Sequence, residues 1–500
     1  MASIKPSVPK GTRDFSPAEM AKRNFIFDTI KSIFRKYGYQ QIETPSMENL
    51  STLTGKYGDE GDKLIFKILN SGPINVYLEK LNKQLDYLKK FGIENPKVED
   101  GKPIPNFTST SGDLGGFIYD ENIVDYARLN NQLLGFLSEK ALRYDLTVPF
   151  ARYVVQHQNE ITFPFKRFQV QPVWRADRPQ KGRYREFFQC DADVVGSDSL
   201  LNEAEFILIY DEALSALGLK DFTIKINNRK ILSGIAELID KSDNIIDLTV
   251  AIDKLDKIGF DGVVKELLER GFTEADIEKI KPVILLQGSN EQKLQSLRSA
   301  LSTSTTGLKG CEEIETVFNY LKSCQIQRAT IELDITLARG LNYYTGAIFE
   351  VKTNEVAMGS IGGGGRYDDL TGMFGLKDLT GAGISFGADR IYDVMEELNL
   401  FPEATNQSTQ VLICCFDKEG EQYALPLLQQ LRSQNINTEL YPAGAKIKKQ
   451  MDYANNKQIP YVILIGSDEM QSGLLSFKNM QSGEQEKLNA EAIIAKLLTQ

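Results

Sequence analysis

The chain concentrates positive charge in one short segment, from Val173 to Asp193, with the sequence VWRADRPQKGRYREFFQCDAD. Its cations are Arg175, Arg178, Lys181, Arg183 and Arg185. The planar guanidinium group of arginine can bind two phosphate oxygens at once, so this density of cations favours a site for a nucleoside triphosphate. A basic loop that faces only solvent explains the segment about equally well by itself, because runs of charge are common on protein surfaces.

Two other segments place an arginine next to a predicted strand. RGLNYY begins at Arg339, and its Tyr343 and Tyr344 offer flat walls that fit a polar ring such as imidazole. A tyrosine pair packed in the core is the alternative for this segment. In GAGISFGADR, small residues precede Arg390 and leave room for a planar ring on the strand. The chain has no Walker lysine motif and no dinucleotide fingerprint, so we expect a nucleotide held by arginines on an antiparallel sheet.

Asp145 and Thr147 lie in LRYDLTVPFARYV, where strand alternation would put both on one face of a strand or extended turn. There they could jointly hold an ammonium group. An aspartate in a turn that binds its own backbone is the favoured alternative when this segment is taken alone.

Composition excludes several classes of function. The formal net charge of −10 argues against a protein that coats nucleic acid, because that mode of binding needs many cations. The five cysteines form no CxxC pair, which indicates a reducing cytoplasm and neither a disulfide framework nor a zinc site. The single histidine, His157, excludes a multi-histidine metal site and is expected to be structural. No apolar run reaches about 18 residues, so neither membrane spanning nor secretion is expected.

Hydrophobic periodicity predicts the elements that position these residues. A helix is predicted over residues 23–37, followed by a strand that ends at Pro45. Residues 229–327 have mainly helical patterns, and Thr273 is placed to cap a helix with Asp276 three residues later. Alternation of apolar residues returns in IELDITLARG, which predicts a half-buried antiparallel strand.

Two further regions differ from this core. Residues 71–138 combine a helical run with a stretch rich in Gly, Ser, Thr and Asn, and are expected to be a surface elaboration that is partly mobile. After the polar linker at 400–409, strand and helix patterns alternate from 410 to 500. This order predicts a small α/β domain with a mostly parallel sheet.

Taken together, these segments resemble the histidyl-tRNA synthetases, a family of class II aminoacyl-tRNA synthetases. The likeness begins at KGTRDF, from Lys10, and continues to the last strand–helix unit. It includes a helix and strand similar to motif 1, a segment similar to motif 2 over 168–193 and one similar to motif 3 over 381–390. RGLNYYTGAIFEV and GGGGRYDDL resemble the two segments peculiar to the histidine-specific enzymes and are the most specific part of the likeness.

The resemblance implies an α+β fold, in which helices flank the antiparallel sheet of a class II synthetase. A helical insertion and a C-terminal α/β anticodon-binding domain complete it. The expected divisions are a first part of the catalytic core at 1–228 with the insertion at about 71–138, the helical insertion at 229–327, a second part of the core at 328–399, a linker at 400–409 and the anticodon-binding domain at 410–500.

The resemblance also implies a histidine site. Asp145, Thr147 and Gln189 would hold the α-ammonium group of histidine. Asp193 and Tyr344 would read the two imidazole nitrogens. The other expected members of the histidine site are Leu146, Arg175, Arg339, Tyr343 and Tyr367.

For ATP, the resemblance implies that Arg175 binds the α-phosphate and the substrate carboxylate, while Arg183 and Arg390 bind the outer phosphates. Arg339 would bind the α-phosphate as the distinctive catalytic cation, so Arg339 and Arg175 are the expected catalytic residues. A carboxylate is already a nucleophile, so activation needs alignment and cations but no general base. Mg²⁺ is expected on the outer phosphates, with ligands that the sequence does not assign.

The implied function is that of a histidine–tRNA ligase. It activates L-histidine with ATP to histidyl-adenylate and pyrophosphate, then transfers histidine to the 3′ end of tRNA(His). A homodimer formed through motif 1 is implied as well, as are tRNA contacts from Lys446, Lys448 and Lys449. The alternative is an inactive, synthetase-like regulatory subunit of ATP phosphoribosyltransferase. Asn342 departs from the family pattern, because many relatives carry aspartate there.

Overall fold

The computed structural model describes residues 5–71, 107–110, 116–119, 137–338, 343–402, 409–442 and 444–499. The chain divides into two compact units. One consists of Met1–Arg13 and Ile26–Leu398, and the other of Asp14–Phe25 and Asn399–Gln500.

The larger unit is built on an eight-stranded sheet with the strand order β1-β7-β8-β13-β12-β11-β9-β10. In this order the strands are Gln40–Gln41, Phe165–Trp174, Glu186–Val195, Gly381–Gly387, Gly362–Tyr367, Ala347–Thr353, Phe222–Asn228 and Ala329–Leu333. From β7 to β9 each strand runs antiparallel to its neighbour. This confirms the expected antiparallel sheet of an α+β fold.

The prediction for IELDITLARG was wrong in its direction and its end. The strand there, β10, runs parallel to β9, because the chain returns to the sheet through helices that cross over from the end of β9. It stops at Leu333 because Asp334 begins a turn, in which its carboxylate accepts hydrogen bonds from the Thr336 backbone N–H (2.9 Å) and hydroxyl (2.6 Å).

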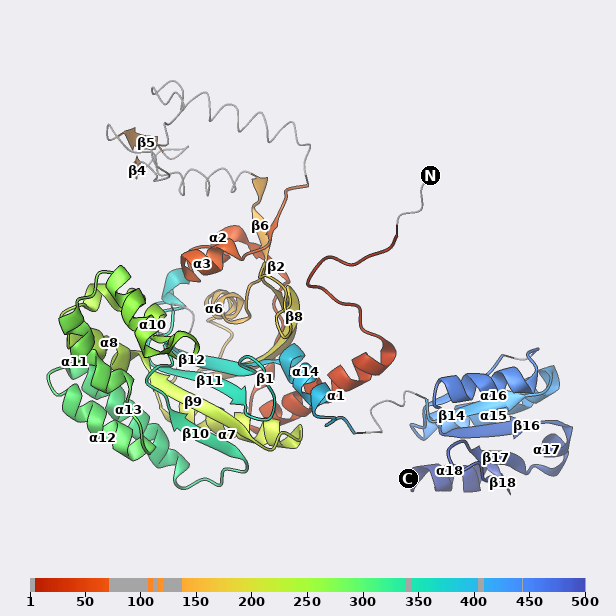
Figure 1. Cartoon of the computed structure of the whole chain (residues 1–500). Helices are drawn as coiled ribbons and strands as arrows, with labels where there is room; N and C mark the ends of the chain where they lie inside the picture. The colour runs from red at the N-terminus through yellow and green to blue at the C-terminus, as the bar shows by residue number, and fades with distance from the viewer. Residues whose placement is uncertain are drawn as a thin grey trace. The chain divides into compact units, whose positions relative to one another are not determined.

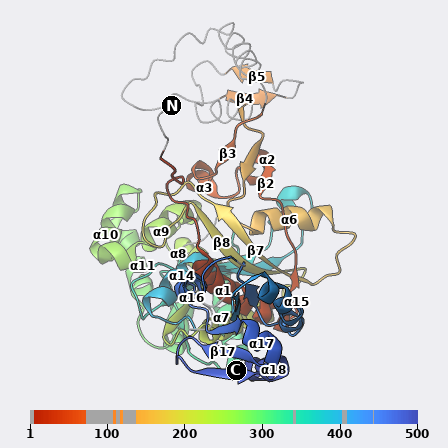
Figure 2. The same cartoon turned by 90° about the vertical axis from the view of Figure 1, so that its right-hand side faces the viewer.

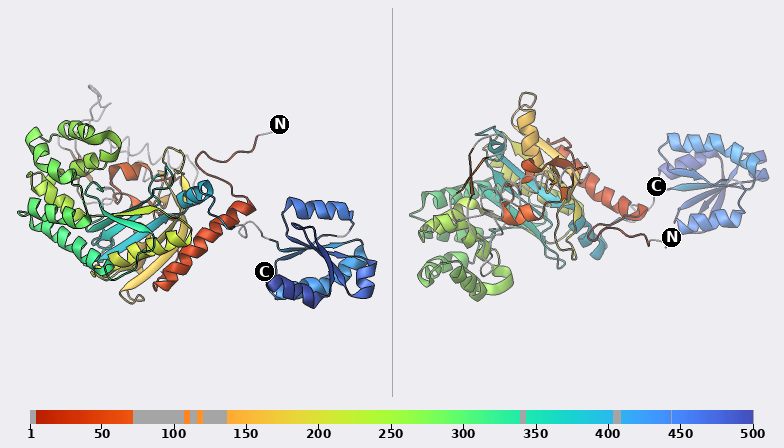
Figure 3. Two further views of the ribbon diagram at one scale, coloured as in Figure 1. Left: turned by 60° about the horizontal axis from the view of Figure 1, so that its bottom comes forward. Right: turned by 90° about the horizontal axis from the view of Figure 1, so that it is seen from above.

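One face of the sheet is apolar and is covered by α1 (Pro17–Lys36) and α7 (Leu201–Ala216), which lie side by side in Figure 3. The Phe34 ring of α1 lies 5.5 Å from that of Phe168 and 5.9 Å from that of Phe386. The ring of Tyr210 of α7 lies 4.7 Å from that of Phe386.

The helix α14 (Ala388–Glu397) follows β13 directly. The first helix starts earlier than predicted, because proline is well suited to a first helical turn.

The opposite face of the sheet carries polar residues, because side chains alternate along each strand. It is covered by α6 (Thr147–Gln156), and the Arg167 guanidinium lies 4.2 Å from the centre of the Phe150 ring. The segments that precede α6 in the chain form a small sheet in the order β2-β6-β3 and two short helices, α2 and α3. These elements are Met47–Asn49, Lys140–Leu142, Lys67–Ile68, Leu50–Leu53 and Gly58–Lys63, and a short 3₁₀ turn η2 spans Gly372–Phe374.

Most of the predicted elaboration at 71–138 lies outside the described residues, including its helical run. Two short strands, β4 (Phe107–Thr110) and β5 (Gly116–Tyr119), are described there and pair antiparallel.

The predicted helical region is present, and Figures 1 and 2 show its helices gathered at the β9–β10 end of the sheet. They are α8 (Arg229–Glu237), the 3₁₀ turn η1 (Ser242–Asn244), α9 (Ile245–Ile252), α10 (Leu255–Glu269), α11 (Glu274–Ile284), α12 (Asn290–Ala300) and α13 (Thr305–Leu321). The Asn290 side chain ties α12 to β10 through bonds to the Ile331 carbonyl and the Leu333 N–H, both 2.9 Å. Thr273 and Asp276 form the predicted capping box.

The smaller unit contains a five-stranded sheet in the order β15-β14-β16-β17-β18. In this order the strands are Thr438–Leu440, Val411–Cys415, Tyr461–Ile465, Leu475–Asn479 and Gln485–Leu488, with helices α15 (Lys418–Ser433), α16 (Ile447–Asn456), α17 (Ser467–Ser472) and α18 (Ala490–Leu498). The first three strands are parallel, as predicted, and β17 and β18 add an antiparallel pair. The sequence did not predict β18 because its first three residues are exposed and polar, which leaves no apolar alternation.

Candidate active site

Three carboxylates, Asp145, Asp191 and Asp193, lie buried on the polar side of the large sheet and are called the carboxylate cluster here. Their exposed fractions are 3%, 2% and 1%. Asp191 and Asp193 come from β8, where Gln189, Asp191 and Asp193 share one face because they are two residues apart. Burial raises the pKa of all three carboxyl groups and brings that of Asp191 to about 7.

Asp145 lies two residues before the start of α6, and Thr147 is helical, so the prediction of a strand or extended turn through Thr147 was wrong. Thr147 is the first residue of the helix, and the Val148 N–H donates to Asp145 Oδ1 at 3.1 Å. This backbone bond is the one that the turn alternative predicts. Asp145 also accepts hydrogen bonds from the hydroxyls of Tyr57 (3.0 Å) and Tyr343 (3.2 Å). The adjacent Leu146 is fully buried, and the Thr147 side chain hydrogen-bonds to Tyr343.

Asp193 is held from two sides. Its Oδ2 lies 2.7 Å from Nη2 of Arg167, and its Oδ1 accepts a hydrogen bond from the Tyr367 hydroxyl at 2.6 Å. Gly383 is its direct partner on β13, and a Cβ atom at that position would overlap the Asp193 carboxylate. Glycine at 383 therefore makes room for the carboxylate.

The tyrosines expected in the histidine site meet beside the carboxylate cluster. The rings of Tyr343 and Tyr344 are 4.9 Å apart at 64°, and those of Tyr343 and Tyr367 are 6.0 Å apart at 88°. Tyr343 is buried, whereas Tyr344 is partly exposed. Tyr344 lies against Gly365 of the glycine-rich strand β12, where a Cβ atom would come within 2.8 Å of its ring. The tyrosine pair is thus packed, as the core alternative predicts, but against charged groups.

Gln189 completes this polar row with one end of its amide unpaired. Its Nε2 donates to Ser385 Oγ at 2.7 Å. Its Oε1 is buried without a hydrogen-bond partner among the described residues. A buried amide oxygen in this position can accept a hydrogen bond from an ammonium group.

The arginines expected to bind ATP are anchored by backbone carbonyls and an aspartate. Arg175 donates to the Tyr144 carbonyl at 3.1 Å and lies 4.3 Å from the centre of the Tyr144 ring. Arg390 donates to the carbonyls of Gly182 (2.6 Å) and Ser360 (2.5 Å), which brings it beside the loop that carries Arg183. Arg183 is 45% exposed and lies 3.4 Å from Asp177. Arg339 and Asn342 lie outside the described residues.

Lys446, Lys448 and Lys449 are exposed at the start of α16, in the smaller unit. The first turn of this helix contains no acidic residue. Cations at a helix N-terminus oppose the helix dipole, so these lysines do not stabilise α16.

Sequence analysis missed Tyr57, Arg167 and Asp191. Asp191 could have been found, because strand alternation puts it on the same face as Gln189 and Asp193. Arg167 gave a weaker signal, as a charged residue inside the strand pattern FKRFQV. Tyr57 lies in no motif, and only the tertiary structure brings it to Asp145.

Comparisons with known proteins cover nearly the whole chain. A family model for histidyl-tRNA synthetase matches residues 11–73 and 137–391, and a model for the anticodon binding domain matches 410–500. A histidine–tRNA ligase of Cytophaga hutchinsonii is 54% identical, and the match covers 99% of this chain and 100% of the relative. One of Christiangramia forsetii is 55% identical over 97% of each.

Solved structures show the same fold. The histidyl-tRNA synthetase from Nostoc sp. PCC 7120 has a TM-score of 0.75 at 29% identity, and the match covers 99% of this chain and 100% of that one. An ATP phosphoribosyltransferase regulatory subunit/histidyl-tRNA synthetase from Bacillus halodurans, at 19% identity and a TM-score of 0.65, shows the fold alone. None of the described helices is long and apolar enough to cross a membrane. The chain belongs to the histidyl-tRNA synthetase family.

Proposed function

We propose that this chain acts as a histidine–tRNA ligase through the carboxylate cluster and the arginines beside it. The observation that carries the proposal is the charge of the buried site. Three buried carboxylates lie together. Among the described residues, Asp193 forms an ion pair with Arg167, and no ion pair is found for Asp145 or Asp191. A site with this excess of negative charge suits an amino acid with a cationic end and a ring that donates hydrogen bonds.

The histidine site follows from the positions of the polar groups. Asp145, Thr147 and the free Oε1 of Gln189 hold the α-ammonium group. Asp193 accepts a hydrogen bond from one imidazole nitrogen, and the Tyr344 hydroxyl contacts the other. Tyr343 and Tyr367 support this arrangement by their bonds to Asp145 and Asp193. Leu146, between Asp145 and Thr147 in the chain, is fully buried.

The activation step needs cations around ATP. A carboxylate oxygen of histidine forms a bond to the α-phosphorus, and the bond from that phosphorus to the bridging oxygen breaks to release pyrophosphate. Arg175 and Arg339 stabilise the charge at the α-phosphate, and Arg183 and Arg390 bind the outer phosphates. In the second step the 3′ hydroxyl of tRNA attacks the adenylate carbonyl and releases AMP.

Magnesium enters as part of the ATP substrate. Among the described residues there is no group of three or more His, Cys, Asp or Glu side chains that could hold a metal ion. Mg²⁺ commonly keeps several waters and binds through substrate phosphates with one or two carboxylates, so a protein cage is not required.

The assembly and location of the enzyme are also proposals. The helix α1 and strand β1 would form a homodimer interface, as motif 1 does in the family. The exposed lysines at the start of α16 would contact tRNA(His). The free cysteines fit a reducing compartment, and we place the enzyme in the cytoplasm. The domain divisions at 228/229, 327/328 and 399–410 are part of the same proposal; the first two lie near the start of α8 at Arg229 and of β10 at Ala329.

Pyrophosphate exchange with each of the twenty amino acids tests the proposal. Purified chain with MgATP should support exchange with histidine and with no other amino acid. Folded protein that exchanges with none would favour the regulatory-subunit alternative. The match of residues 410–500 to the anticodon binding domain argues against that alternative.

A further inference from the structure

Asp191 lies in the middle of the polar row on β8, yet the proposed histidine site gives it no direct contact with the substrate. It is 2% exposed, and its direct partner on β13 is Ser385. Residues directly opposite each other in an antiparallel pair have Cβ atoms about 4.5–5.5 Å apart, close enough for their side chains to meet. This register places the Ser385 hydroxyl beside the Asp191 carboxylate, and the hydroxyl lowers the pKa of that carboxyl, as a donor directed at its charged form does.

The same hydroxyl faces Gln189. A serine hydroxyl has one hydrogen to donate, so once that hydrogen points to Asp191 its oxygen can only accept. It accepts from Gln189 Nε2 at 2.7 Å. The nitrogen end of the amide is thereby fixed, and the oxygen end, Oε1, is left buried and without a partner among the described residues.

We propose that Asp191 is a positioning residue, which acts through Ser385 to hold the Gln189 amide with its oxygen toward the α-ammonium group of histidine. The inference rests on the proposed function, because it assigns a cause to the orientation of one residue in that site. Asp191 itself touches neither the ATP nor the reacting atoms.

The burial of Asp191 is costly to the fold, which fits a functional reason for keeping it. Its Oδ1 has no hydrogen-bond partner in the described part of the chain, and burial raises its pKa to about 7. The charged groups that act on it are Arg167 of β7, Asp193 of its own strand, and Asp145 before α6. Arg143, which follows β6, also lies within reach of its charge.

Substitutions at both members of the relay test the inference. In Asp191→Asn and Ser385→Ala, we expect the KM for histidine in pyrophosphate exchange to rise about tenfold, the scale of one hydrogen bond to a charged group. The KM for ATP and kcat should stay within about twofold. Ser385→Thr is the matched control: it keeps the hydroxyl and should keep the histidine KM of the unmodified chain.

Equilibrium binding of histidine without ATP provides the second readout, with urea unfolding at pH 8 to confirm folding. Asp191→Asn should bind histidine more weakly while unfolding at the same or a higher urea concentration. An unchanged histidine KM in both variants would overturn the inference, as would equal increases in the KM for histidine and ATP. If the unmodified chain activates no amino acid, the proposed function fails instead, so the two failures are distinguishable.

Discussion

At the scale of single residues, the site depends on charges that are buried without full compensation. Arg167 and Asp193, which are 0% and 2% exposed at their side chains, form an ion pair. Two further carboxylates, Asp145 and Asp191, share the same polar face. Buried negative charges raise the cost of folding, and they also raise the affinity for a cationic ligand. Binding of histidine is therefore expected to stabilise the larger unit.

Gly383→Ala should abolish histidine binding, because the new Cβ atom would overlap the Asp193 carboxylate and displace it. We expect the KM for histidine to rise at least about a hundredfold, which corresponds to about 2.7 kcal/mol, while ATP binding is retained. Pyrophosphate exchange at varied histidine and varied ATP separates the two effects. Gly387→Ala is the control on the same strand, since the nearest atom to its Cβ is the Ile361 oxygen at 3.5 Å. Equal kinetics for the two variants would refute the packing argument.

The pKa of Asp191 predicts how stability depends on pH. The pKa of its carboxyl rises from the ordinary value of 3.8 to about 7, mainly because it is buried. Between those values the folded chain keeps a proton that the unfolded chain has lost, so stability falls as pH rises from about 4 to 7 and then levels off. Asp191→Asn removes the titrating group and therefore the decrease in stability that it causes. The quantity to compare is the difference in unfolding free energy between the variant and the unmodified chain. This difference should be larger at pH 8 than at pH 4, in favour of the variant, by on the order of a few kcal/mol. A variant with the same pH dependence as the unmodified chain would contradict the assignment.

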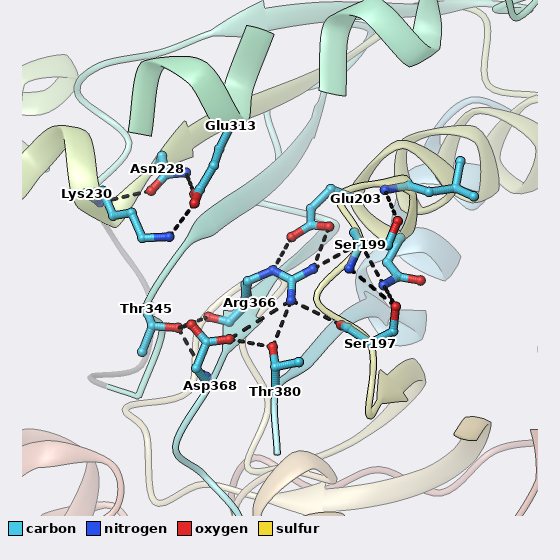
Figure 4. A network of polar contacts seen from close by, with 12 residues as sticks. Ser197, Ser199, Glu203, Asn228, Lys230, Glu313, Thr345, Arg366, Asp368 and Thr380 are labelled. Carbon is cyan, nitrogen blue, oxygen red and sulfur yellow. Dashed lines mark hydrogen bonds and ion pairs between the residues drawn. The ribbon is translucent and has the colours of Figure 1, made fainter. Parts of the chain in front are cut away.

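At the scale of elements, one network connects the glycine-rich strand β12 to α7 and to the start of β13. Figure 4 shows Arg366 of β12 between Glu203 of α7 and Thr380. Its Nε and Nη2 bind the Glu203 carboxylate at 2.5 and 2.8 Å, and its Nη1 donates to Thr380 Oγ1 at 2.8 Å. Asp368 and Thr345 extend the network on the Thr380 side, with the Thr345 hydroxyl 2.6 Å from Asp368 Oδ2. Because Arg366 precedes Tyr367, the network also fixes the tyrosine that contacts Asp193.

Glu203→Gln should destabilise the larger unit by about 3–5 kcal/mol, because it removes the buried counter-charge of the Arg366 guanidinium and leaves only Asp368, which is 4.0 Å away and 40% exposed. Urea unfolding of the full chain, followed by a probe in the larger unit, measures the change. Glu212→Gln is a matched control on the same helix: Glu212 pairs with Lys36, whose side chain is 66% exposed, so the loss should stay below about 1 kcal/mol. Similar losses in both variants would show that burial of the pair does not matter.

The elements also show what sequence reasoning could and could not predict. The small residues of GAGISFG predicted a strand with room for a planar ring; β13 confirms the strand, but the Asp193 carboxylate fills the space at Gly383. Thr147 was misplaced because its neighbours Val and Phe favour strands, whereas the carboxylate of Asp145 accepts the Val148 N–H and α6 begins there. The parallel direction of β10 depends on a crossover that no local pattern records. The bond from Tyr57 to Asp145 joins residues 88 apart, so only the tertiary fold could reveal it.

At the scale of the whole molecule, the two units carry different parts of the proposed machinery. The larger unit carries the carboxylate cluster, and the smaller one carries the exposed lysines at the start of α16. The chain has a formal net charge of −10, so tRNA binding must depend on local positive charge and should weaken as salt increases.

Substitution of Lys446, Lys448 and Lys449 by alanine together should raise the KM for tRNA in aminoacylation by about tenfold or more and reduce its dependence on salt. Pyrophosphate exchange should be unchanged, because that step needs no tRNA. Lys457→Ala is the control on the same helix region, since Lys457 already pairs with Glu439 at 2.9 Å. An unchanged KM for tRNA in the triple variant would remove these lysines from the proposed interface.

The most direct test of the central claim is aminoacylation of tRNA(His) by the purified full-length chain. Labelled histidine and ATP would be supplied, with the other nineteen amino acids as unlabelled competitors. We predict that histidine is transferred to the 3′ end of tRNA(His) at a rate that the competitors do not reduce, and that Asp193→Asn lowers this rate by at least about tenfold. Absence of transfer by folded protein, or full activity in the Asp193→Asn variant, would contradict the assignment of the carboxylate cluster as the histidine site.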